Sequence, residues 1–204
     1  MAEQNRVTPF GEIVAIPQRG LFMGNRGSIH RGRSIVRPWQ VRRWITCALE
    51  FRGWRAPMRE PGRWTPLFFW DEAVALAAGH RPCALCRRAD FVAWLDSWAS
   101  AFGERPRVDP MDRRLHAERV DGRAQRRHRR SWRDLPAGTF VVLGDTAALV
   151  LFDRLVPWST HGYEHAVDRP LHGDATVLTP PSTVAVLAHG YRPIVHPTAG
   201  RLRE

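Results

Sequence analysis

A pair of cysteines three residues apart is the feature that most restricts the fold of this 204-residue chain. Cys83 and Cys86 occur in the string RPCALC, and a single tight turn can direct two thiolates at this spacing toward one tetrahedral metal ion. Neighbouring arginines also favour thiolates, which permits a redox dithiol. A thioredoxin-like redox pair is expected to follow a buried strand, whereas this pair follows a predicted helix. Metal binding is therefore the stronger interpretation.

The segments on either side of the cysteine pair predict a strand, a short helix and a long helix. Residues 64–70 are bulky and aromatic, as in a strand, and Asp71 is placed to cap a helix over residues 72–78 that Gly79 ends. After the cysteines, apolar side chains recur at helical spacing in residues 87–102. The pair is thus predicted to lie in a short connection between two helices.

A closed zinc site needs four donors, so two further ligands are required beside the pair. Cys47 lies within a predicted strand, and His116 lies on the helix predicted after the one that starts at the cysteines. The expected cofactor is one structural zinc ion per chain, held by Cys47, Cys83, Cys86 and His116.

The string PLFFWDEAVALAAGHRPCALC, from Pro66 to Cys86, resembles the second half of the zinc-binding domain of the Ada methylphosphotriester repair protein. In that domain an aromatic strand, an alanine-rich helix and Gly-x-Arg-Pro-Cys-x-x-Cys follow one another in this order. The resemblance covers a tenth of the chain and implies that Cys83 and Cys86 are zinc ligands. The family's other half has two cysteines four residues apart, whereas this chain has only Cys47 upstream, so the family's methyl transfer does not follow. The whole chain is expected to belong to a bacterial family.

The other segments predict an α+β fold of mixed short strands and helices around the zinc site, with a β-rich C-terminal half. Residues 139–143 and 146–152 predict a hairpin, because Gly144 and Asp145 form a two-residue turn between them. Residues 183–189 predict a short helix capped by Ser182.

Three regions are expected along the chain. Residues 1–120 form a zinc-containing α+β region, residues 121–134 a basic linker or arm, and residues 135–204 a β-rich region. One continuous domain over residues 1–204 is the alternative.

All 31 basic residues are arginines, so the formal net charge of +11 is carried by a side chain that binds phosphates and carboxylates as a fork. A basic chain of this kind is a candidate for binding RNA, DNA or another polyanion. A chain without lysine and rich in Ala, Arg, Gly and Pro is equally typical of GC-rich codon usage. The distribution of the arginines is therefore more informative than their number.

Two stretches without acidic residues, 13–49 and 122–133, concentrate the arginines. Trp132 in the second stretch could stack on a base. If the six arginines of that stretch each met a phosphate of duplex DNA, the slope of log affinity against log salt would be roughly −5. A flexible basic linker is the alternative interpretation. The predicted nucleic-acid-binding residues are Arg26, Arg31, Arg33, Arg123, Arg126, Arg127, Arg129, Arg130 and Trp132.

Two other functions fit the same residues. Zinc deaminases combine His-x-Glu with Pro-Cys-x-x-Cys around a zinc-activated water, and here His116, Ala117 and Glu118 supply the first string. Glu118 would then be the general acid and base of a deaminase-like or nucleolytic zinc hydrolase, although the two strings occur in reversed order. The third possibility is a protein–protein adaptor whose arginines bind an acidic partner.

No signal for export or membrane insertion is found in the sequence. The first twenty residues contain Glu3 and Glu12 and lack an apolar core after a basic start. The longest apolar stretches fall far short of the roughly 20 residues needed to cross a bilayer. We expect a cytoplasmic protein with no membrane partner, in which the cysteines are reduced.

Overall fold

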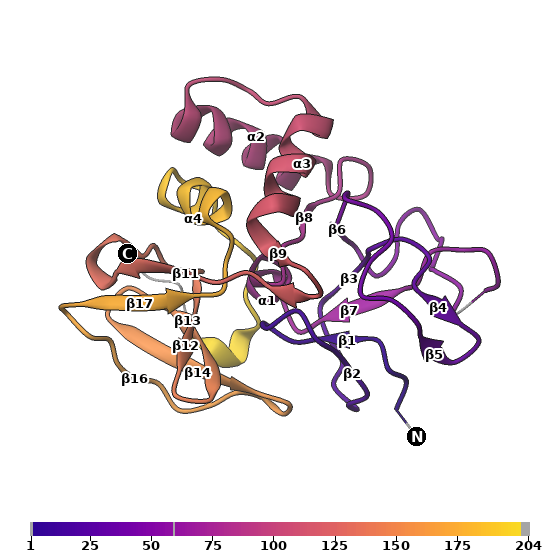
Figure 1. Cartoon of the computed structure of the whole chain (residues 1–204), viewed down its shortest axis with the longest axis horizontal. Coiled ribbons are helices and arrows are strands. Elements are labelled where there is room, and N and C mark those ends of the chain that lie inside the picture. Colours follow the sequence, from indigo (N-terminus) through magenta and orange to yellow (C-terminus); the bar gives the residue numbers. More distant parts are fainter. Residues whose placement is uncertain (1, 59, 201–204) are drawn as a thin grey trace.

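The computed structural model describes residues 2–58 and 60–200 and has the predicted α+β fold (Figure 1). Two sheets lie side by side, one from the N-terminal part of the chain and one from the C-terminal part. Helices α2, α3 and α4 lie together above them in Figure 1, and α1 lies at the centre.

The N-terminal sheet has the strand order β2-β1-β7-β3-β6-β8. Two of its pairs are parallel, β1 with β7 and β6 with β8, and the others are antiparallel. A separate small hairpin joins β4 to β5. The strands are β1 (Arg6–Val7), β2 (Ile13–Val14), β3 (Phe22–Asn25), β4 (His30–Arg31), β5 (Ser34–Ile35), β6 (Ile45–Cys47), β7 (Leu67–Phe69) and β8 (Arg81–Pro82).

The C-terminal sheet has the order β11-β17-β12-β13-β14-β15, with β16 also paired to β14. All its pairs are antiparallel. The hairpin predicted around Gly144 is confirmed, and this glycine has the positive φ of 58° that the tight turn requires. The strands are β11 (His128–Ser131), β12 (Phe140–Leu143), β13 (Thr146–Val150), β14 (Arg154–Ser159), β15 (Gly162–Tyr163), β16 (Val167–Asp168) and β17 (Asp174–Val177).

Four α-helices connect and cover the two sheets in the described residues: α1 (Glu72–Ala77), α2 (Arg88–Phe102), α3 (Val108–Arg119) and α4 (Pro181–Ala188). The predicted cap of α1 is confirmed, because the Asp71 carboxylate accepts a hydrogen bond of 2.9 Å from the Val74 amide. Short 3-10 turns follow β11 and precede residue 200.

One hydrophobic core extends across both sheets. Every residue of α1 is buried, and the helix packs with Leu67 and Phe69 of the N-terminal sheet and with Phe140 and Leu149 of the C-terminal sheet. A second cluster, centred on Trp94, joins α2, α3 and α4. Residues 121–134, expected as a linker or arm, contain part of the hairpin of β9 (Val120–Asp121) and β10 (Ala124–Gln125), and all of β11, which pairs with β17.

Residues 191–196 are held against the start of α1 by its two buried carboxylates. Glu72 accepts hydrogen bonds from the Tyr191 hydroxyl at 2.5 Å and from the Ile194 amide at 2.9 Å. Asp71 accepts from the His196 amide at 2.9 Å. The segment after the last helix is thereby fixed to an element that lies over one hundred residues earlier in the sequence.

In the part of the chain that the structure describes, none of the helices has the length and apolar character required to cross a membrane.

Candidate metal centre and basic groove

Three cysteines from two parts of the chain form one cluster. Their sulfur atoms all lie within 4.8 Å of one another, close enough to hold a metal ion. Cys47 ends β6, and Cys83 directly follows β8. These strands pair in parallel, and the Cys83 amide donates a hydrogen bond of 2.9 Å to the Thr46 carbonyl, so the backbone itself brings the two cysteines together.

The turn from Cys83 to Cys86 supplies the third sulfur. The Leu85 amide donates to the Cys83 sulfur at 3.4 Å, which stabilises negative charge on that atom. Thiol donation from Cys47 and Cys86 lowers the pKa of Cys83 to about 2, and the same hydrogen bonding to Cys83 raises the pKa of Cys47. Cys83 is therefore the sulfur of the cluster that most readily carries negative charge. A metal ion would be required to hold all three sulfurs as thiolates.

The surroundings of the cluster are mostly apolar. Met23 lies opposite Cys47 in the β3–β6 register, and Trp64 and Phe68 pack against the same cluster. Cys47 and Cys83 are buried, whereas Cys86 is partly exposed. An all-sulfur donor set suits a soft or borderline metal such as zinc better than magnesium or calcium.

His116, predicted as the fourth ligand, does not belong to the cluster. Among the described residues, the group that could hold a metal contains the three cysteines and no histidine, aspartate or glutamate. The register of α3 directs the His116 ring to Trp39, with 4.5 Å between the ring centroids, and its Nδ1 lies 3.3 Å from the Arg119 guanidinium. The expectation of a Cys3His site is corrected to a three-cysteine cluster.

Glu118, the candidate general acid and base, is also placed elsewhere. Its carboxylate accepts hydrogen bonds from the amide and hydroxyl of Ser182, at 2.8 and 2.6 Å. It also forms an ion pair of 3.1 Å with Arg114. Glu118 thus binds the first turn of α4, where unpaired amides favour a carboxylate, and has no contact with the cysteines that would support proton transfer there.

A basic groove adjoins the cysteine cluster. One hollow of about 830 Å³ is lined by Cys83, Arg43, Arg107 and Arg113, among others. A neighbouring hollow of about 600 Å³ shares Arg43 and Arg113 with it, and adds Arg42. We call these two hollows together the basic groove.

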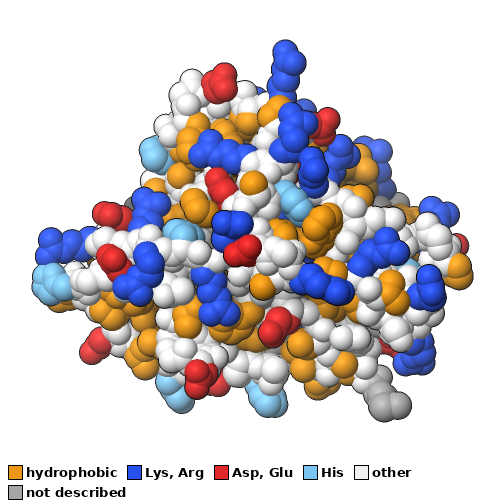
Figure 2. Space-filling view, in the orientation of Figure 1, with side chains coloured by type: hydrophobic (Ala, Val, Ile, Leu, Met, Phe, Trp, Pro, Cys, Tyr) orange, Lys and Arg blue, Asp and Glu red, His pale blue; other side chains and the backbone are white. Residues whose placement is uncertain are grey.

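The basic groove carries an excess of positive charge. Asp112 pairs with the buried Arg81, and Asp109 lies 3.4 Å from Arg43. Its other arginines, Arg42, Arg107 and Arg113, form no ion pair with a carboxylate in the described part of the chain. Figure 2 shows basic side chains gathered near α3, whose start forms one wall of the groove. Arg42 belongs to the stretch 13–49, which is rich in arginine and free of acidic residues. No sequence pattern predicts that Arg107 and Arg113 lie in the same groove.

The structure separates the predicted nucleic-acid-binding residues into buried and exposed groups. Arg26 is 3% exposed and Trp132 is 8% exposed within the core of the C-terminal sheet, which corrects the expectation that Trp132 stacks on a base. Arg130 is partly exposed. The exposed members are Arg31, Arg33, Arg123, Arg126, Arg127 and Arg129.

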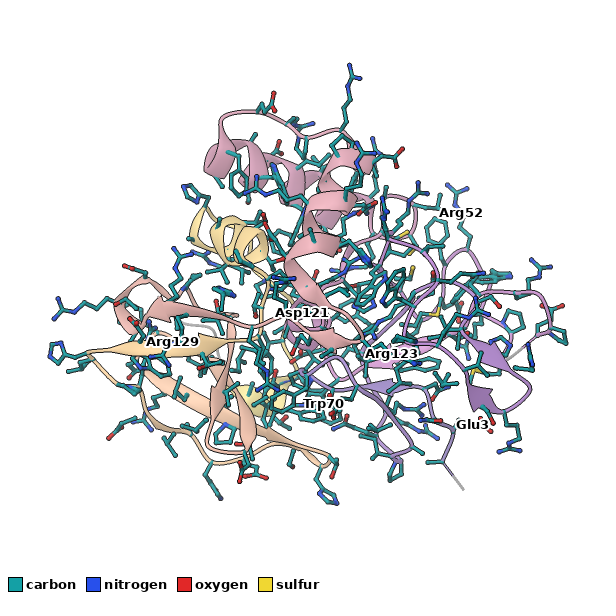
Figure 3. The ribbon with its side chains drawn as sticks, in the orientation of Figure 1. Glu3, Arg52, Trp70, Asp121, Arg123 and Arg129 are labelled. Carbon is teal, nitrogen blue, oxygen red and sulfur yellow. The ribbon has the colours of Figure 1, made fainter. Side chains whose placement is uncertain are left out.

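Several of the exposed arginines already have partners. Arg33 pairs with Glu3 at 2.5 Å, and Arg126 lies 3.6 Å from Asp121. Figure 3 shows Arg129 on the C-terminal sheet, well away from Arg123. The predicted set is therefore spread over the surface, and the basic groove concentrates arginines beside the metal centre.

Comparison of the chain with protein-family models, with curated proteins and with solved structures found no match. The geometry of the cysteine cluster and the basic groove is therefore the basis for inferring a function.

Two neutral histidines near the buried arginines make stability depend on pH. Burial, together with the charges of Arg26 and Arg119, holds the pKa of His80 well below its usual value. Burial, Arg119 and Arg42 lower the pKa of His116 to about 4. The unfolded chain therefore binds protons more readily than the folded chain at pH values between about 4 and 6.5.

We expect the free energy of unfolding to fall as the pH is lowered through this range, and His116→Gln to make that dependence shallower. Denaturant unfolding of wild type and variant at several pH values measures the difference. Burial raises the pKa of Asp71 to about 6, which changes stability in the opposite direction. This contribution is the same in both proteins and cancels in the comparison. His165→Gln, at an exposed position, serves as the control. Equal pH dependence in wild type and His116→Gln would show that His116 is protonated alike in both states.

Proposed function

We propose that this protein binds zinc through Cys47, Cys83 and Cys86 and binds a nucleic-acid backbone in the adjoining basic groove. The observation that carries the proposal is that Cys83 lines the same hollow as Arg43, Arg107 and Arg113. The resemblance of residues 66–86 to the Ada zinc-binding domain independently favours zinc as the metal at Cys83 and Cys86.

The arginine excess favours a polyanionic ligand. Nucleic-acid affinity comes largely from arginine and lysine contacts to phosphates, and the groove offers three arginines that no carboxylate neutralises in the described residues. In this proposal the metal centre fixes the turn after β8 and thereby one wall of the groove. RNA and DNA share the phosphate backbone, so the arginines favour neither.

Replacing Arg107 or Arg113 with alanine is expected to weaken binding of RNA or DNA oligonucleotides. Each lost phosphate contact should reduce the slope of log affinity against log salt by about one in magnitude. Fluorescence anisotropy over a series of salt concentrations measures both quantities. Arg154→Ala removes an arginine that is 56% exposed and lies outside the groove, and is the matched control.

Two outcomes would contradict the nucleic-acid proposal. One is binding that does not change with salt. The other is equal affinity for Arg107→Ala, Arg113→Ala and the control Arg154→Ala.

A second candidate, zinc-dependent hydrolysis, has one observation in its favour. Three protein donors leave one position of a tetrahedral ion for water, as in catalytic zinc sites. Glu118 binds Ser182 instead, so Asp109, which lines the groove, is the carboxylate available to accept a proton. Zinc-dependent cleavage or deamination of an oligonucleotide that is lost in Asp109→Asn would favour this candidate over binding alone.

A further inference from the structure

Two buried arginines lie over the ring of one tryptophan. The guanidinium carbon atoms of Arg26 and Arg119 are 4.1 and 4.0 Å from the centroid of the Trp44 ring. Their side chains belong to residues that are only 3% and 2% exposed. Two cations are thus withdrawn from water within one small region.

The hydrogen-bond partners of Arg26 and Arg119 are neutral groups. Arg26 donates to the Gly11 carbonyl at 2.9 Å and lies 3.4 Å from His80 Nε2. Arg119 donates to the carbonyls of Gly79 and Arg42, each at 2.5 Å.

In the described residues no carboxylate is in direct contact with either of these two arginines. Within the described residues neither Arg26 nor Arg119 forms an ion pair, and Asp112, whose charge acts on Arg119, is held by both arms of the Arg81 fork. Burial lowers the pKa of Arg26 to about 9. Unpaired charges in a protein interior are costly, so an arrangement of this kind favours an anion that enters from outside.

Both arginines line a small pocket, and each has one donor atom without a partner in the described residues. These atoms, Arg26 Nη2 and Arg119 Nε, are buried, and no described residue forms a hydrogen bond with them. Both residues line a pocket of about 30 Å³, together with Trp39, Trp44 and Arg123 among others. This volume exceeds the roughly 10–15 Å³ needed for one water molecule.

The β9–β10 hairpin forms one side of this pocket. Figure 3 shows Arg123 at the end of the hairpin, where it meets the N-terminal part of the molecule. Arg123 is exposed and has no hydrogen bond or ion pair in the described chain, so its charge is available at the mouth.

We propose that this pocket binds an oxyanion of the phosphate class, held by Arg26 and Arg119 inside and by Arg123 at the mouth. The guanidinium fork matches the oxygens of such a group, which would supply the missing negative charge and accept from the free donors. A neutral water molecule in the pocket would leave the charge of the two arginines uncompensated. The pocket shares no lining residue with the basic groove, so the proposal stands apart from the proposed function.

Thermal unfolding in inorganic phosphate, compared with chloride at equal ionic strength, tests the proposal. At a phosphate concentration about 100 times its Kd, the midpoint should rise by roughly 5–10 °C. Arg123→Ala should weaken phosphate binding about tenfold, which corresponds to roughly 1.4 kcal/mol. Arg126→Ala, next to the same hairpin but outside the pocket lining, should bind as wild type.

Arg26→Met removes the inner charge and should abolish the phosphate effect. If this variant does not fold, Arg123→Ala still decides the matter, because that side chain is exposed and unbonded in the described residues. The proposal is wrong if phosphate and sulfate stabilise the protein no more than chloride, or if Arg123→Ala binds phosphate as tightly as wild type.

The phosphate group could belong to a free ion or to bound nucleic acid, and competition separates the two sources. If it belongs to a nucleic acid, inorganic phosphate competes with an oligonucleotide and Arg123→Ala weakens both ligands. If it is a free ion, Arg123→Ala weakens phosphate alone. Loss of oligonucleotide binding in Arg107→Ala with phosphate binding intact, or the reverse, shows which of the two proposals has failed.

Discussion

Cys83→Ser is expected to lower the metal content of the purified protein from about one ion per chain to nearly none. The Cys83 sulfur accepts a hydrogen bond from the Leu85 amide and lies with the other two sulfurs in the cluster, and its pKa is lowered, so it readily becomes a thiolate. A serine hydroxyl is a poor donor to a soft metal. Elemental analysis of the two proteins, purified identically, measures the change.

Loss of the metal should also destabilise the fold. The cluster joins β6 and β8 to the start of α2, and structural zinc sites contribute directly to folding free energy. We expect Cys83→Ser to unfold at a lower temperature than metal-bound wild type. Wild type treated with a chelator should unfold at the same lower temperature as Cys83→Ser. Leu85→Ser, an exposed position in the same turn, introduces the same hydroxyl and should keep the metal. Wild type that contains no metal, with three reactive thiols and an intact fold, would contradict the metal centre.

Asp112→Asn is expected to reduce the free energy of unfolding by about 3–5 kcal/mol, the usual effect of removing one partner of a buried ion pair. Asp112 accepts two hydrogen bonds from Arg81, at 2.8 and 2.9 Å, and both side chains are almost completely buried. It is also the carboxylate whose charge acts on Arg119. Its loss would remove the carboxylate that pairs with the buried Arg81 and the negative charge that acts on the buried Arg119.

Asp109→Asn is the matched control, since it is the same substitution one turn earlier on α3. The Asp109 side chain is 74% exposed, and its one ion pair within the described residues is with the exposed Arg43 at 3.4 Å, so stability should change little. Denaturant unfolding of the three proteins gives the difference. Equal loss for both variants would show that the Arg81–Asp112 pair is no more important than a surface contact.

Helix caps, helices and tight turns depend on residues close together in the sequence, so local sequence patterns predicted them. The cap at Asp71, the long helix over residues 87–102 and the turn at Gly144 are all found in the structure. The prediction of Ser182 as the cap of α4 was wrong: the helix starts at Pro181, and Ser182 is a first-turn residue bound by Glu118. Proline is well suited to a first helical position, because its missing amide has no helical partner there.

The candidate site could be predicted only in part, because long-range pairing determines it. The spacing of Cys83 and Cys86 is visible in the sequence, and the addition of Cys47 agrees with the cluster that the structure shows. The parallel pairing of β6 with β8 that brings Cys47 there has no local signal. The orientation of the His116 side chain is set by its ring contacts with Trp39 and Trp44, which depend on how α3 packs. The shape of the groove depends on the same packing, because the start of α3 lines it.

The attachment of residues 191–196 to α1 has a consequence for the order of folding during synthesis. Asp71 and Glu72 are completely buried in the folded protein, and their partners Tyr191, Ile194 and His196 are synthesised over one hundred residues later. Until then α1 lacks both these partners and the C-terminal sheet that covers it. The N-terminal sheet therefore cannot complete its core until residues 191–196 have been synthesised, and we expect the incomplete chain to be a substrate for chaperones.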